Sequence, residues 1–402
     1  MIGVVRRESC LTFQLLLLLW LSLVCSIICG HWIGISHVVN GKYLRTRKFV
    51  NRNMEHKYRT STPRLPTLAY GVEWKLINMQ QEIPSPRFDF AYASTPDYSL
   101  SFLFGGVNSS WSIMNDFWIL EHQHLKWTKI VKENNDDLWP PALRDAAAVF
   151  CLGDFYVFGG KSTGGSVSGD VWKFNLSLRK WSIVNRGKDE DQAKIASRFG
   201  HSAICIGNSF IVIFGGSDKN NNFYNQLHLF NNGTFTEIEP NGPVTIPPRM
   251  YTPIIFNPTD SSLFAFGGYV KISANESANN DELWQFDLLR KQWKQIEKQN
   301  SAIWPPSRSG HNLFKTTQFS NNFYVFGGEL LNGLGTNDMY SFNVITSQWT
   351  VIPTQGNSSP PGRLGAAFIQ KSYSSGEYIL FGGVSGWTNT KVLGDEWLAS
   401  LR

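Results

Sequence analysis

Six Gly-Gly pairs recur along this chain at nearly constant intervals of 54, 56, 52, 60 and 55 residues. A period of this length is typical of repeat architectures, in which one unit is too small to bury a core alone and packs against its neighbours. Glycine suits these positions because it permits positive φ and close approach of the backbone. The pairs are Gly105-Gly106, Gly159-Gly160, Gly215-Gly216, Gly267-Gly268, Gly327-Gly328 and Gly382-Gly383.

Each repeat predicts four short strands. A proline turn and an Arg precede the first strand, and a second strand of aromatic and aliphatic residues, the composition favoured on a packed sheet, ends at Gly-Gly. A third strand begins around segments such as Asn115–Trp118, and a fourth opens with an aromatic residue such as Trp127. Four strands in about fifty residues are typical of one blade of a β-propeller.

The last repeat lacks its fourth strand. After Gly383, the aromatic residue that should open this strand would fall beyond Arg402. Upstream of the first repeat, Trp74-Lys-Leu-Ile77 has the same aromatic-x-x-aliphatic pattern. We therefore predict that residues 70–78 complete the last blade and close the ring, which would leave no open sheet edge between the first and last blades.

The succession of aromatic-Gly-Gly, Asp-x-Trp and Trp-x-x-Ile segments resembles the kelch repeat family. The resemblance covers residues 70–402 in six copies, and it implies an all-β, six-bladed propeller with four antiparallel strands per blade. A seven-bladed ring is the competing architecture, but the chain has no seventh Gly-Gly repeat. The family's Arg-x-Gly-His motif is present only at Arg198–His201 and Arg308–His311. We expect these two histidines to satisfy hydrogen bonds of the inner strands.

The N-terminus predicts export. Residues 1–30 read as a signal peptide or a signal anchor, because Arg6-Arg7 precedes an apolar run at residues 11–28. The run is close to the roughly 18–20 residues that span a bilayer, so its length does not decide between cleavage and membrane attachment. In both cases we expect a secreted or membrane-anchored protein with a lumenal or extracellular propeller, unless the basic flank reverses the orientation. Five sequons are candidate glycosylation sites: Asn108, Asn175, Asn232, Asn275 and Asn357.

The net charge of +6 is not spread over the chain. The first 30 residues carry +1, residues 31–66 carry +7, and the remainder carries −2. We interpret residues 31–69 as a basic, disordered linker, with contact to anionic lipid or glycan as the alternative. Nucleic acid is not an expected partner, because the propeller itself lacks a basic excess.

Only two of the five cysteines lie outside the leader. Cys151 and Cys205 each follow the Arg of their repeat by seven residues, which would place them at equivalent positions on inner strands of neighbouring blades. A disulfide needs Cα atoms about 4.4–6.8 Å apart, and we expect two buried thiols instead of a bridge.

No catalytic, cofactor-binding or metal-binding motif stands out. His122-Gln-His124 has no third ligand nearby, so a turn or an exposed strand is the simpler interpretation. The copper ligands of galactose oxidases and the Glu-x-x-x-Asp-x-x-x-His motif of plant specifier proteins, both kelch-like, are not found. The sequence therefore favours a non-catalytic binding module, with an extracellular oxidoreductase or carbohydrate-active enzyme as the alternative, since a propeller can disperse a site over several blades.

Two sets of residues are candidates for binding a protein or glycan ligand. One is the repeated Arg, for which hydrogen bonding to loop carbonyls is the structural alternative to recognition of acidic peptides. The other set consists of aromatic residues in the loops after Gly-Gly, which should lie on the same face and could instead fold back over a neighbouring blade. The Arg set is Arg87, Arg144, Arg198, Arg249, Arg308 and Arg363, and the aromatic set is Trp111, Tyr269 and Trp387.

Overall fold

The structure is a computed structural model. It describes residues 71–402, apart from 79–81, 135–136, 188–194, 274–275, 299–302, 318–319, 373–375 and 389. The chain divides into two units, Met1–Thr67 and Leu68–Arg402, of which the second is described below. The predicted signal segment, the basic linker and the Asn275 sequon lie outside the described residues.

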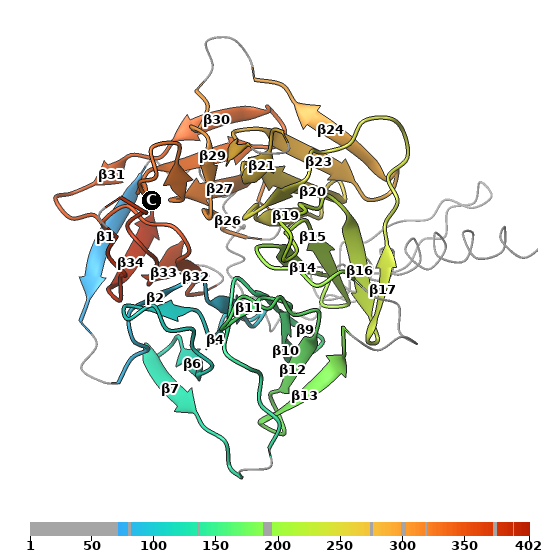
Figure 1. Cartoon of the computed structure of the whole chain (residues 1–402). Helices are drawn as coiled ribbons and strands as arrows, with labels where there is room; N and C mark the ends of the chain where they lie inside the picture. The colour runs from blue at the N-terminus through green and yellow to red at the C-terminus, as the bar shows by residue number, and fades with distance from the viewer. Residues whose placement is uncertain are drawn as a thin grey trace, which may run out of the picture. The chain divides into compact units, whose positions relative to one another are not determined.

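The second unit is a six-bladed β-propeller, as predicted. Six sheets follow one another around a common centre, and in each the first strand lies innermost and the fourth outermost (Figure 1). The strands of each blade pair in antiparallel fashion with their neighbours in the order first, second, third and fourth.

Blade 1 consists of β3 (Ala91–Ser94), β4 (Leu100–Phe104), β6 (Phe117–Glu121) and β7 (Lys126–Ile130). Blade 2 consists of β9 (Ala147–Cys151), β10 (Asp154–Phe158), β12 (Val171–Asn175) and β13 (Lys180–Asn185). Blade 3 consists of β14 (Ser202–Ile206), β15 (Phe210–Phe214), β16 (Leu227–Asn231) and β17 (Thr234–Glu237). Blades 4 and 5 are built from these: β19 (Ile254–Asn257), β20 (Ser262–Phe266), β23 (Leu283–Asp287) and β24 (Gln292–Ile296); β26 (Asn312–Phe314), β27 (Asn322–Phe326), β29 (Met339–Asn343) and β30 (Gln348–Val351).

Blade 6 draws on both ends of the unit. Its inner strands are β32 (Ala367–Gln370), β33 (Glu377–Phe381) and β34 (Glu396–Leu401), and its fourth strand is β1 (Val72–Ile77), which pairs with β34 over all six residues. The strand expected at Trp74–Ile77 is therefore β1. The sheet also has a fifth strand that the sequence did not suggest, because β31 (Thr354–Gln355) pairs in parallel with the start of β1.

The core lies between the blades. Each pair of neighbouring blades encloses its own cluster of buried apolar side chains, including the pair formed by blades 6 and 1. The aromatic residue of each fourth strand packs on the Phe that precedes Gly-Gly in the preceding blade. Trp74 follows this rule, with its ring centroid 5.1 Å from that of Phe326. The N-terminal strand thus provides the same packing that the other five fourth strands provide.

A second layer of short strands covers one face of the ring. Each joins the segment that holds the repeated Arg to the loop after Gly-Gly, so the two candidate sets of loops share one face, which we call the Gly-Gly loop face. These short strands are β2 (Arg87–Phe88) with β5 (Val107–Asn108), β8 (Leu143–Arg144) with β11 (Lys161–Ser162), β18 (Arg249–Met250) with β21 (Tyr269–Lys271) and β22 (Ser277–Asn279), and β25 (Arg308–Ser309) with β28 (Glu329–Leu330).

A closed ring of six backbone hydrogen bonds lies on the inner side of this layer. The N–H of one residue in each blade donates to the carbonyl of its counterpart in the preceding blade, with N···O distances of 2.7 to 3.1 Å. The bond from Asp89 to Gly365 links blade 1 to blade 6. All six residues have φ between 53° and 63°, a conformation that favours glycine. They are Asp89, Asp145, Gly200, Tyr251, Gly310 and Gly365.

Candidate functional site

Five of the repeated Arg residues are buried and bonded inside the protein. In Arg308, Nε donates to the Pro306 carbonyl (3.0 Å) and Nη1 to the Gly327 carbonyl (2.9 Å). The same guanidinium donates to both carboxylate oxygens of Asp338, at 2.7 and 2.9 Å. Equivalent carbonyls bind the other four, which are Arg87, Arg198, Arg249 and Arg363. Because these side chains are no more than 3% exposed, they are structural and do not line a pocket for an acidic ligand.

Arg144 was assigned to the wrong position in its repeat. In the other five repeats, the carbonyl of the repeated Arg accepts the N–H of the second glycine of the preceding blade, but in repeat 2 the accepting carbonyl belongs to Leu143. Leu143 is therefore the counterpart of the buried Arg, and Arg144 lies one residue later. A shift of one residue along a strand turns a side chain to the opposite face. The Arg144 side chain is accordingly 29% exposed, with Nη1 2.9 Å from Asp145 Oδ2 and 3.9 Å from Asp89 Oδ2.

Three side chains meet at the hydrogen-bonded ring. Asp89 and Asp145, from neighbouring blades, lie close enough for each to shift the pKa of the other, and Tyr251 interacts with Asp145. Burial and the adjacent Asp145 charge raise the pKa of Asp89 well above its ordinary value. Burial also raises the pKa of Asp145, although Arg144 opposes this effect. The centre of the face therefore holds a buried, coupled carboxyl pair that the sequence did not reveal.

Trp111 and Trp387 come together on the Gly-Gly loop face although 276 residues separate them. Their ring centroids are 6.5 Å apart, and both rings pack edge-on against buried Phe88, at 5.7 and 5.9 Å. The two indoles nevertheless stay 58% and 46% exposed. Trp111 occupies the tip of a tight turn with φ of 60°, which is an uncommon conformation for an aromatic residue.

The loop that carries Trp387 is fastened to the loop of blade 5. Trp387 N–H donates to the Gly333 carbonyl at 2.8 Å, and Gly386 pairs with Leu334. Gly386 has φ of 125° and approaches this loop so closely that a Cβ would lie 2.5 Å from the Gly333 oxygen. Exposed Leu331 and Leu334 extend the apolar surface beside Trp387. We call Trp111, Trp387, Leu331 and Leu334 the Trp surface.

Glu329 adjoins the Trp surface. It directly follows the Gly-Gly pair of blade 5, and its backbone carbonyl accepts a hydrogen bond from Asn279 Nδ2 at 3.0 Å. Burial raises the pKa of its half-buried carboxyl, and the polar side chains of Trp387 and Asn279 partly oppose this effect. Within the described part of the chain, no Lys, Arg or His lies within ion-pair distance of it.

Tyr269 does not join the Trp surface. It lies in β21 and not in a polar loop, and its ring packs on Phe223 at 6.1 Å, between blades 3 and 4. Lys271 Nζ also lies over Phe223, 5.8 Å from the ring centroid. An open pocket of about 460 Å³ is lined here by Asn222, Phe223, Pro248, Lys271, Ile272 and Ser273.

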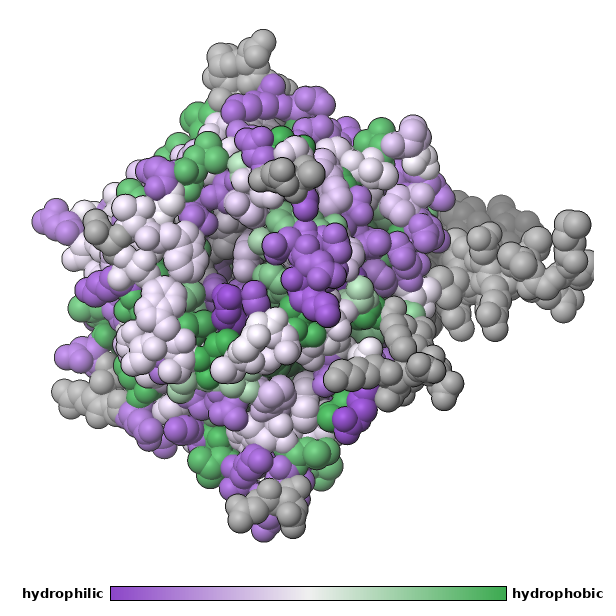
Figure 2. Space-filling model, in the orientation of Figure 1, coloured by the Kyte–Doolittle hydropathy of each residue, from purple (hydrophilic) through white to green (hydrophobic). Residues whose placement is uncertain are grey.

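Hydropathy alone does not mark either site. In the view of Figure 2, hydrophobic residues form small groups scattered among hydrophilic ones. The Trp surface is found only when backbone contacts bring its loops together, because its residues come from three blades.

Comparison with known proteins identifies the repeat. The KLHDC2/KLHL20/DRC7 Kelch-repeats domain matches residues 68–194 and 186–383. The chain belongs to the kelch-repeat family. Kelch-repeat domains generally mediate protein–protein interactions, and membership of this family is consistent with a binding module.

Several kelch-repeat relatives are larger proteins. Acyl-CoA-binding domain-containing protein 5 of Arabidopsis thaliana is 26% identical over 337 residues, covering 81% of this chain and 49% of the relative. Kelch repeat-containing protein 2 of Saccharomyces cerevisiae is 28% identical over 233 residues, covering 54% of this chain and 24% of the relative. Host cell factor of Drosophila melanogaster is 26% identical over 230 residues, covering 50% of this chain and 14% of the relative. The chain spans about half or less of the length of these relatives.

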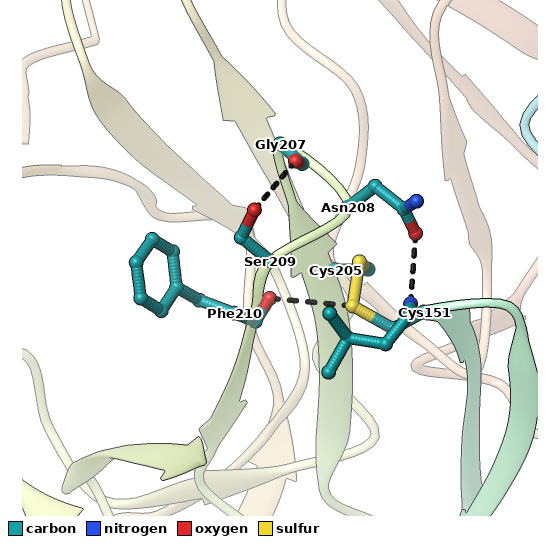
Figure 3. The surroundings of a disulfide bond; sticks show 7 residues. Cys151, Cys205, Gly207, Asn208, Ser209 and Phe210 are labelled. Atoms are coloured by element: carbon teal, nitrogen blue, oxygen red, sulfur yellow. Dashed lines mark hydrogen bonds between the residues drawn. A yellow bond between two sulfur atoms is a disulfide. The ribbon is translucent and has the colours of Figure 1, made fainter. Parts of the chain in front are cut away.

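The two cysteines of the kelch propeller form a disulfide, so the expectation of free thiols is wrong (Figure 3). Their Cα atoms are 5.7 Å apart, within bridging range. The strands β9 and β14 both begin opposite the Phe that precedes Gly-Gly, but Cys151 is the last residue of its strand, whereas Ile206 follows Cys205. Side chains alternate between the two faces of a strand, so two cysteines at equivalent positions of blades 2 and 3 would both face the same way around the ring and could not meet. The offset of one residue places the Cys205 side chain on the opposite face of its strand, toward Cys151.

Polar contacts surround this disulfide. Leu152 N–H donates to Asn208 Oδ1 at 2.8 Å, and the Phe210 carbonyl lies 3.8 Å from Cys151 Sγ. Both contacts cross from the first hairpin of blade 2 to that of blade 3 (Figure 3). The two blades are thus joined covalently at their inner hairpins.

The histidines that the structure describes do not form a metal site. His122 is buried against Ser101 (2.7 Å), whereas His124 is exposed and lies 3.2 Å from Glu121. His201 Nδ1 and both ring nitrogens of His311 have no hydrogen-bond partner among the described residues, contrary to expectation. These two rings pack against glycines of the preceding blade, and burial lowers the pKa of His201 to about 3. Within the described ranges, no group of three or more His, Cys, Asp or Glu could hold a metal.

The four described sequons differ in their surroundings. Asn232 and Asn357 are exposed. Asn175 Nδ2 donates to Asp154 at 3.0 Å, and Asn108 Oδ1 accepts the N–H groups of two serines in the Trp111 turn. No helix in the part of the chain that the structure describes is long and apolar enough to cross a membrane, and residues 11–28 lie outside that part.

Proposed function

We propose that this kelch protein is a non-catalytic module of the secretory pathway or extracellular space that binds a protein partner through the Trp surface. The observation that carries the proposal is the exposed pair of Trp111 and Trp387, held edge-on against Phe88 by loops of different blades. A protein partner is favoured over a glycan because kelch-repeat domains generally mediate protein–protein interactions.

Energetics supports a binding role for these indoles. The aromatic residues of the fourth strands are buried between blades, whereas Trp111 and Trp387 gain only part of that stabilisation. Full burial of a large apolar side chain is worth roughly 1.5–3 kcal/mol, and a docked partner would provide the remainder. Tryptophans near the centre of an interface commonly dominate its binding energy. Exposed Leu331 and Leu334 enlarge the area that a partner would cover.

Two features support export. The disulfide between Cys151 and Cys205 is of a kind that persists in oxidising compartments and is rare in the cytosol. The Arg6-Arg7 and apolar 11–28 pattern is typical of a secretory leader. The experiment is to express the full chain in eukaryotic cells and test for glycan and for the disulfide. An unglycosylated cytosolic product with two free thiols would contradict export.

Site-specific photo-crosslinking tests the Trp surface. A photoreactive residue placed at Trp111 or Trp387 should capture a discrete partner from intact expressing cells. Leu178 and Ile345 are matched controls, because both are 71% exposed and lie in turns between third and fourth strands, at the opposite face of the ring. Equal capture from the control positions would contradict the proposed surface.

A double variant provides the complementary test. Trp111→Ser with Trp387→Ser should abolish recovery of the crosslinked partner, with little change in melting temperature, because about half of each side chain is exposed. The matched Leu178→Ser and Ile345→Ser variant should retain the partner. If the tryptophan variant loses folding and binding together, these residues belong to the core and the proposal fails.

A further inference from the structure

Glu329 is a half-buried carboxylate beside two exposed indoles. Glu329 Oε1 would lie 4.0 Å from a Cβ on Gly333, whose carbonyl accepts the Trp387 N–H, so the carboxylate lies beside the Trp387 loop. The side chains of Trp387 and Asn279 that lower its pKa are both neutral, so its negative charge stays uncompensated. A buried charge without a counter-charge is costly unless a cation arrives.

We infer that the partner inserts an arginine side chain between the Trp surface and Glu329, an inference that rests on the proposed function. The guanidinium would stack on the Trp387 indole and donate N–H groups to the Glu329 carboxylate. Arginine is preferred to lysine, because its planar group stacks on aromatic faces and donates several hydrogen bonds in one plane. Charge-assisted bonds of this type are the stronger class of hydrogen bond.

Basic side chains near the centre of the same face are already engaged or buried, which argues against an acidic ligand there. Arg144 lies 2.9 Å from Asp145, and this carboxylate compensates its charge. Lys161 Nζ lies over the Phe199 ring, 5.0 Å from its centroid. The five buried Arg side chains are inaccessible. Glu329 therefore presents, beside the Trp surface, a negative charge that a partner can compensate.

The test is a selection of random twelve-residue peptides displayed on phage against the full chain. Wild-type protein should enrich peptides that contain arginine next to apolar residues. Replacing that arginine by alanine in a synthetic copy should weaken binding at least about tenfold, as expected for loss of one partner of a desolvated charge pair. Replacing it by lysine should cause a smaller loss. Selection of acidic peptides, or of peptides without basic residues, would overturn the inference.

Two variants separate this inference from the proposed function. Glu329→Gln keeps the size and polarity of the side chain but removes the charge, so it should lose the arginine preference and still enrich apolar peptides. Glu121→Gln, at the opposite end of a blade, is the matched control and should behave as wild type. Unchanged arginine preference in Glu329→Gln would refute the inference alone. Equal enrichment by wild type and by Trp111→Ser with Trp387→Ser would refute the proposed function.

Discussion

Removal of the disulfide should measure how much one covalent bond between two blades stabilises the propeller. The perturbation is Cys151→Ala with Cys205→Ala, which leaves no unpaired thiol and adds no buried hydroxyl. The blades are also held by their apolar cluster, so the variant should fold but be less stable.

The magnitude follows from the length of the loop that the bond closes. Cys151 and Cys205 are 54 residues apart. The chain-entropy relation gives about 4 kcal/mol at 25 °C for a loop of this size. Unfolding entropy of about 2.1 cal/mol/K per residue gives roughly 0.7 kcal/mol/K for a propeller of about 330 residues. The melting temperature should therefore fall by about 6 °C.

Scanning calorimetry of the folded protein is the assay. Wild-type protein in reductant should melt at the temperature of the double variant, because reduction removes the same bond without changing side chains. Mass spectrometry after alkylation should find no free thiol at Cys151 or Cys205 in unreduced wild type. Two alkylated cysteines in that sample, or a double variant that melts within about 1 °C of oxidised wild type, would refute the reasoning.

Three further predictions concern buried charge and glycosylation. Arg308→Met should cost about 3–5 kcal/mol in urea unfolding, because it leaves the partners of a buried guanidinium unpaired, whereas the exposed control Arg290→Met should cost less than about 0.5 kcal/mol. Because the pKa of Asp89 is raised in the folded protein, folding stability falls as the pH rises from the unfolded-state pKa through the folded-state pKa. Asp89→Asn should therefore raise the melting temperature at pH 8 and not at pH 4. Equal effects at both pH values would contradict this prediction. Peptide mapping of secreted protein should find more glycan at exposed Asn232 than at Asn175, whose amide is hydrogen-bonded, and the reverse order would contradict the accessibility argument.

The sequence predicted the features that repeat from blade to blade, and it missed the features that depend on a shift of one residue along a strand. Six Gly-Gly pairs gave the number of blades, and Trp74 repeated the pattern of the other fourth strands. In contrast, Arg144 was placed one residue too early in the pattern. The spacing held a usable signal, because Leu143 and Arg308 both stand three residues after the first Pro of a Pro-Pro pair. The same kind of error hid the disulfide, since Cys205 stands one residue out of register with Cys151.

The candidate site was only partly predictable. Trp111 and Trp387 were noticed because they break the repeat, but nothing in the sequence indicated that they meet. Their contact depends on how blades 6 and 1 are joined, and the role of Phe88 as their support follows only from that contact. Nothing in the sequence indicated that Glu329 belongs to the site, because its position beside Trp387 depends on the loops of blades 5 and 6.

The pairing of β1 with β34 imposes an order of events on biosynthesis. The first strand of the propeller has no antiparallel partner until the last one emerges, about 320 residues later. At about 5–20 residues per second, the ribosome needs roughly 15–65 s for this stretch. During that time Trp74 and its strand remain an unpaired, partly apolar segment, and every earlier blade can assemble while the final one cannot. Folding of this protein therefore requires that its N-terminal strand be kept from wrong partners until β34 has been made.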